Sequence, residues 1–148
     1  MAHVKKYAKA ALGHMACHFA RAVDEHGNYL KFGNQDIDPA KTHLNYNLAP
    51  ERDGGQVAFI QQRCHEVRCL KRGDVKVMCS WVLTAPLEIA GGEHEREFFQ
   101  KSYDFMAKRY GEENVVSAYV HQDENTPHMH FAFVPVTRDK KRGDLKVS

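Results

Sequence analysis

Two apolar segments joined by a short turn most constrain the fold of this 148-residue chain. The segments are NVVSAYVHQD (residues 114–123) and PHMHFAFVPV (residues 127–136), which meet at the turn ENTP. Each alternates apolar side chains with polar or small ones, which predicts a half-buried β-strand. Because the connection is too short for a crossover, the two strands are expected to pair antiparallel.

Helical and extended periodicities elsewhere predict an α+β fold with a largely antiparallel sheet. Helical spacing of apolar residues predicts helices over residues 12–23, 55–72 and 93–111. Further strands are predicted over residues 1–11, 42–48 and 75–86. The segment 24–43 is rich in Gly, Asn and Asp and predicts a loop.

Composition is that of an ordinary soluble protein, with 43% hydrophobic and 27% charged residues. The length predicts a single domain over residues 1–148. Four cysteines without a CxxC pair argue against a zinc ribbon or a disulfide framework, and favour reduced thiols in the cytoplasm. We find no secretory signal and no apolar run of about 18 residues, so we expect no membrane segment.

The overall charge is only +2, which does not by itself indicate a nucleic-acid-binding protein. Basic residues are concentrated, however, in residues 61–76 and 137–146. Such a distribution fits either a positive face or an ordinary solvated surface.

Three histidines lie on or beside the predicted hairpin. His128 and His130 are two residues apart, so in a strand they point the same way, about 7 Å apart. His121 lies across the turn, where pairing brings it beside them. Three convergent imidazoles with open coordination positions suit a catalytic metal site, whereas the alternative is an exposed, merely polar face. Asp123 and Glu124 in the turn are placed to orient a histidine or to reach a metal-bound water.

Two shorter motifs are less specific. His18 and Arg21 in HFAR share a helix face at i, i+3, a combination that suits phosphate chemistry but also occurs on solvated faces. In LNYNL, Asn45 precedes Tyr46, and a strand tyrosine usually belongs to the core.

Taken together, HFAR, HLNYNL and HQDENTPHMHFAFVPV resemble the motifs of the MobV relaxases, the Pre/Mob plasmid mobilisation enzymes. The resemblance spans residues 10–140. It implies an HUH-type nuclease fold, in which an antiparallel sheet carries a histidine metal site. It also implies an enzyme that binds a plasmid origin of transfer, cleaves one DNA strand, remains linked to the 5′ end and later rejoins the strand.

The resemblance assigns roles to individual residues. It implies His18 as the nucleophile, Arg21 as its motif arginine, and Glu124 as an acid that orients or activates the nucleophile. The implied ligands of Mn²⁺ or Mg²⁺ are His121, His128 and His130. We further expect DNA contacts from Asn45 and Tyr46 of the second motif, and phosphate contacts from Arg63, Arg68, Lys71 and Arg72.

Some features depart from the family pattern. Phe19 stands where an asparagine is common, and His14 and Tyr46 are alternative nucleophiles. Family members continue well beyond Ser148, so we expect the relaxase domain to be truncated. Two alternatives remain: a metal-dependent phosphoesterase that uses metal-bound water, and a DNA-binding module without catalysis.

Overall fold

The structure is a computed structural model that describes residues 2–28 and 37–148. A five-stranded antiparallel sheet runs through its centre in the order β1-β3-β5-β4-β2. Its strands are β1 (Ala2–Ala8), β2 (Tyr46–Asn47), β3 (Lys76–Thr84), β4 (Val115–His121) and β5 (His128–Phe133). The predicted α+β class and the β4–β5 hairpin are therefore confirmed.

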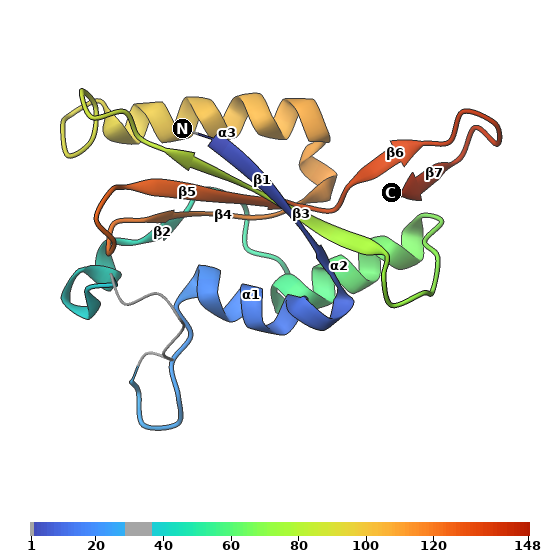
Figure 1. Cartoon of the computed structure of the whole chain (residues 1–148), viewed down its shortest axis with the longest axis horizontal. Helices are drawn as coiled ribbons and strands as arrows, with labels where there is room; N and C mark the ends of the chain where they lie inside the picture. Colours follow the sequence, from blue (N-terminus) through green and yellow to red (C-terminus); the bar gives the residue numbers. More distant parts are fainter. Residues whose placement is uncertain (1, 29–36) are drawn as a thin grey trace.

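Helices cover both faces of the sheet (Figure 1). On one face lie α1 (Leu12–Ala20) and α2 (Gly55–Glu66), and on the other lies α3 (Glu95–Tyr110). Alternation along β5 divides the core accordingly: Met129 and Phe131 pack toward α3, whereas Ala132 packs toward α1 and α2.

Helix α3 follows the predicted pattern closely. Its buried stripe is Phe99, Tyr103 and Met106. The helix ends before Gly111, which has a φ of 92°. Residues other than glycine rarely adopt this backbone conformation.

The prediction for α2 was wrong at its end, because the helix stops at Glu66 and not at residue 72. Val67 is extended and buried. The next residue, Arg68, exchanges backbone hydrogen bonds with β7 (Leu145–Val147): its N–H donates to the Leu145 carbonyl and its carbonyl accepts from Val147. Strand β7 pairs with β6 (Val136–Arg138) in a small hairpin that we did not predict.

Two other boundaries also differ. Helix α1 ends at Ala20 because Arg21 adopts a left-handed conformation. The strand predicted over residues 42–48 is reduced to β2, since a 3-10 helix over Pro39–Leu44 takes its first half. Of the predicted loop 24–43, residues 29–36 lie outside the described residues. No helix within residues 2–28 and 37–148 has the length and apolarity needed to cross a bilayer.

Candidate active site

The three histidines singled out in the sequence meet where β4 and β5 join. The strand register pairs His121 with His128, and Tyr119 with His130. Ring centroids are 5.4 Å apart for His121 and His128, 4.7 Å for His121 and His130, and 4.9 Å for His128 and His130. All three rings lie on the sheet face that packs against α1, and His121 is fully buried.

Backbone carbonyls orient two of these rings. Nε2 of His121 lies 2.8 Å from the carbonyl oxygen of Phe19, and Nδ1 of His128 lies 2.9 Å from that of Thr126. Because a carbonyl oxygen only accepts, these nitrogens are the N–H donors. The opposite nitrogens, Nδ1 of His121 and Nε2 of His128, therefore face the centre of the cluster, where they lie 3.5 Å and 3.0 Å from Oε2 of Glu124. Metal-binding histidines are commonly held in this way.

Glu124 completes a four-residue group. One ligand atom each from His121, Glu124, His128 and His130 lies within 4.8 Å of the others. Burial opposes ionisation of Glu124, but hydrogen bonds from His121 and His128 and the charge of Arg21 outweigh it, so the pKa of this carboxyl lies far below its usual value. Nε2 of His130 is buried and finds no hydrogen-bond partner among the described residues. Three imidazoles, one of which has an unsatisfied buried nitrogen, and one carboxylate fit a divalent metal ion.

His18 lies beside this group, on the last turn of α1. Its ring centroid is 6.0 Å from that of His121 and 5.9 Å from that of His130. Burial, with smaller contributions from Arg21 and His121, lowers the pKa of His18 to about 4. The imidazole is therefore neutral at physiological pH, as a nucleophile requires. His14, one turn earlier on α1, is exposed and is not part of the four-residue group.

Arg21 occupies an unusual backbone conformation. It is the only non-glycine residue among those described with a positive φ, at 54°, which costs about 1–2 kcal/mol. Its Nε donates to Asp123 Oδ2 and its Nη2 to Glu124 Oε2, both at 2.9 Å, and its Nη1 donates to the His18 carbonyl at 2.9 Å. The side chain is 4% exposed. The guanidinium thus meets acids of the protein, and does not present its donors to solvent as a phosphate clamp would.

Asp123, which we expected to orient a histidine or to reach a metal-bound water, instead binds Arg21 and residues of the second motif region. Its side chain is fully buried and accepts hydrogen bonds from Arg21, from Thr42 Oγ1 at 2.8 Å and from Asn45 Nδ2 at 3.1 Å. Its backbone carbonyl accepts from the N–H of Asp38. The available signal was an acid within HQDE, but its partners lie 78 to 102 residues away, which spacing alone does not disclose.

Two of the arginines expected to contact DNA are engaged within the protein. Arg63 Nε donates to Asn114 Oδ1 at 2.8 Å, and only 12% of its side chain is exposed. Arg68 forms ion pairs with Asp139 at 2.7 Å and with Asp144 at 2.9 Å, both in the β6–β7 connection. These arginines link structural elements and offer fewer free donors to a phosphate.

The other two basic residues are exposed but distant. Arg72 pairs with Asp74 at 3.3 Å, and Lys71 makes no ion pair with any described residue. Both precede β3, whose opposite end carries Thr84 paired with His128. They therefore lie at the end of the sheet away from the histidines (Figure 1).

The second motif also faces inward. Both ends of the Asn45 amide are used, since Nδ2 donates to Asp123 and Oδ1 accepts from the N–H of Gln122 at 2.6 Å. Tyr46 packs against the core beneath α3, with the Arg96 guanidinium 4.1 Å from its ring centroid. The sheet therefore separates Tyr46 from the histidine cluster.

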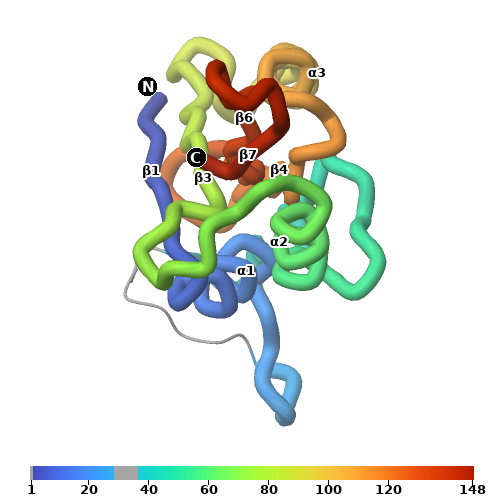
Figure 2. The backbone as a smooth tube through the Cα atoms, turned by 90° about the vertical axis from the view of Figure 1, so that its right-hand side faces the viewer, coloured from blue at the N-terminus to red at the C-terminus, as the bar shows by residue number. Residues whose placement is uncertain are grey.

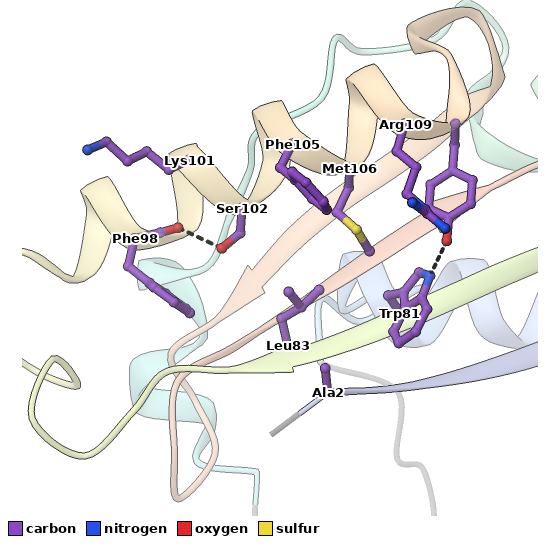
Figure 3. Close-up of a pocket in the computed structure, with 10 residues that line it drawn as sticks. Ala2, Trp81, Leu83, Phe98, Lys101, Ser102, Phe105, Met106 and Arg109 are labelled. Atoms are coloured by element: carbon purple, nitrogen blue, oxygen red, sulfur yellow. Dashed lines mark hydrogen bonds between the residues drawn. The ribbon is translucent and has the colours of Figure 1, made fainter.

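A cavity of about 620 Å³ lies on the face of the sheet that α3 covers, between α3 and strands β1 and β3 (Figure 3). Trp81, Leu83, Phe98 and Met106 line it, and Trp81 Nε1 donates to the Tyr110 hydroxyl at 3.0 Å. None of the described residues that line it is acidic, and the sheet separates it from the histidine site.

Comparison with known proteins agrees with this geometry. The family model of the plasmid recombination enzymes, Mob_Pre, matches residues 1–147. A plasmid recombination enzyme of Streptococcus agalactiae is 33% identical over 95% of this chain and 28% of its own length. One of Lactiplantibacillus plantarum is 35% identical over 73% of this chain and 32% of its own length. The chain thus spans about a third or less of these curated relatives.

A solved structure shares the fold and more than a quarter of the sequence. The Mn-bound MobM relaxase domain in complex with plasmid pMV158 oriT DNA superposes with a TM-score of 0.79 at 30% identity, over the whole of this chain and 73% of that one. A second Mn-bound complex of the same domain gives a TM-score of 0.78. The chain therefore belongs to the plasmid recombination enzyme family, with the fold of the MobM relaxase domain.

Proposed function

We propose that this chain is the nuclease part of a plasmid relaxase, which binds an origin of transfer, cleaves one strand and joins its 5′ end to His18. One observation carries the proposal: a neutral histidine lies about 6 Å, ring to ring, from a convergent group of three histidines and a glutamate. Support comes from the similar MobM relaxase domain, which is bound to oriT DNA and Mn. Because the substrate is plasmid DNA, the reaction belongs in the cytoplasm.

The residues that would hold the metal are His121, Glu124, His128 and His130. Three imidazoles favour Mn²⁺ over Mg²⁺, which prefers oxygen ligands. When bound, the ion supplies positive charge to the non-bridging oxygens of the scissile phosphate.

His18 supplies the nucleophile through its unprotonated ring nitrogen. A bond forms between this nitrogen and phosphorus as the bond to the 3′ oxygen breaks, and the proton lost by the imidazole balances the one gained by that oxygen. The phosphoramidate product keeps the reaction reversible, so that a 3′-hydroxyl can displace His18 and restore the strand. Arg21 orients the nucleophile, since its Nη1 donates to the His18 carbonyl and lies 3.4 Å from Nδ1 of the ring.

Supercoiled plasmid carrying the DNA that borders the gene for this chain tests the proposal. Purified protein with Mn²⁺ should convert it to nicked circles with protein attached to the 5′ end, and EDTA should prevent this. His128→Ala should abolish nicking, while His26→Ala, at a histidine side chain 75% exposed, should not. Nicks without attached protein would indicate a phosphoesterase instead. DNA binding without nicks would indicate a non-catalytic binding module.

A further inference from the structure

The first part of the chain is free of acids. Asp24 is the first acidic residue, and the cations before it are Lys5, Lys6, Lys9 and Arg21. Arg21 is buried in its ion pairs, whereas the three lysines are exposed. None of these lysines forms an ion pair or a hydrogen bond through its side chain with another described residue. A run of unpaired cations without neighbouring acids in the sequence suits the binding of a polyanion.

The sheet register assigns the lysines of β1 to opposite faces. His3 pairs with Val82, and Val82 pairs with His130, so His3 shares a face with the metal-ligand histidines. Lys5 follows on the same face two residues later. Lys6 lies on the other face, as does Ala2, which lines the cavity under α3 (Figure 3).

The face of β1 that carries His3 and Lys5 is close to the histidine site. Neighbouring strands lie about 4.8 Å apart, so β1, two strands from β5, places His3 about 10 Å from His130. Strand β1 forms the edge of the sheet and runs down toward α1 (Figure 2). Beyond its end, Lys9 and Lys71 both line a cavity of about 520 Å³ between α1, α2 and β3. Free cations therefore extend from the site along the side of α1.

We propose that the face of β1 bearing His3 and Lys5, continued by Lys9, binds the phosphates of the DNA strand that flanks the cleavage point. The inference rests on the proposed function, because it takes the substrate at the neighbouring site to be DNA. Lys5 and Lys9 contact phosphate oxygens as point charges, and His3 is the member nearest the site. The surface therefore binds without reading sequence, and positions the strand whose scissile phosphate lies at the histidines.

Salt-dependent binding of a fluorescein-labelled single-stranded oligonucleotide of mixed sequence tests the inference. Removal of one lysine that binds a phosphate flattens the slope of log K against log salt by about 0.7. Lys5→Ala should flatten the slope by about this amount, and the double variant Lys5→Ala, Lys9→Ala should flatten it by about twice as much. Lys6→Ala is the matched control, since it removes the same charge from the same strand on the opposite face, and its slope should equal that of the wild type.

Three results would overturn the inference. Equal flattening by Lys5→Ala and Lys6→Ala would mean that only total charge matters. A wild-type slope in the Lys5→Ala, Lys9→Ala double variant would remove β1 from the binding surface, while wild-type nicking of plasmid in the same preparations would leave the proposed function standing. Wild-type protein that neither binds nor nicks DNA would contradict both.

Discussion

Arg21 and Asp123, 102 residues apart in sequence, form an ion pair inside the protein, with Nε 2.9 Å from Oδ2 and side chains 4% and 0% exposed. Each partner adjoins one half of the site: His18 lies three residues before Arg21, and Glu124 directly follows Asp123. The pair therefore fixes the end of α1, which carries the proposed nucleophile, against the turn that carries the proposed metal ligands.

Removing one partner of this pair should destabilise the fold. Asp123→Asn removes one of the two carboxylates that pair with the buried guanidinium of Arg21 and leaves only Glu124, so we expect the free energy of unfolding to fall by about 1.5–3 kcal/mol. Urea denaturation measures this. Arg72→Ala is the control, because it breaks an arginine–aspartate pair whose side chains are 71% and 73% exposed, and it should change stability by no more than about 0.5 kcal/mol. Similar decreases in the two variants would contradict the structural role of the buried pair.

The covalent adduct should map to His18. Wild-type protein incubated with Mn²⁺ and cleavable origin DNA should give a nucleotide-linked peptide that contains His18 and loses its DNA in acid, as a phosphoramidate does. His18→Ala should form no adduct. His14→Ala and Tyr46→Phe should form it, because His14 is exposed and Tyr46 lies across the sheet. An acid-stable adduct at Tyr46, identified by mass spectrometry, would refute the assignment.

The hairpin was the part of the fold best predicted from sequence. Alternation determines which face the residues of β5 occupy, and those of β4 after the bulge between Val115 and Ser117. The short turn determines the pairing, so the approach of His121, His128 and His130 followed from local pattern alone. The end of α2 did not follow. Nothing in residues 55–72 indicates that the backbone of Arg68 pairs with β7, which is distant in sequence.

The electrostatic partners could not be predicted either. Arg21, Arg63 and Arg68 have the sequence pattern of surface cations, yet each meets an acid or an amide that lies 51 or more residues away. Only the tertiary fold determines which cations remain free. Consequently the sequence pattern predicted phosphate contacts for arginines that the fold engages internally, and it did not indicate Lys5 as a phosphate ligand.

Arg68 and Lys71 should differ in their effect on DNA binding, although both were predicted to contact phosphates. Arg68→Ala removes the ion pairs to Asp139 and Asp144, so we expect lower stability with little change in the salt slope of binding. Lys71 has no such partner among the described residues and lines the same cavity as Lys9, so Lys71→Ala should flatten the slope by about 0.7. Oligonucleotide titrations at several salt concentrations, with thermal melting in parallel, separate the two effects. Flattening by Arg68→Ala at unchanged stability would contradict the expectation.

Mn²⁺ should stabilise the protein through the four-residue group. A ligand at a hundred times its Kd raises the free energy of unfolding by about 2.7 kcal/mol when it binds only the folded state. We expect this gain in metal-free wild-type protein on addition of Mn²⁺, measured by urea denaturation, and a much smaller gain in His128→Ala or His130→Ala. Because each variant is compared with and without metal, any change of intrinsic stability from the substitution cancels. His26→Ala should keep the full gain, since His26 lies outside the group. An equal gain in His26→Ala and His128→Ala would place the metal elsewhere. The buried Nε2 of His130, which has no hydrogen-bond partner among the described residues, would then lack the ligand that accounts for it.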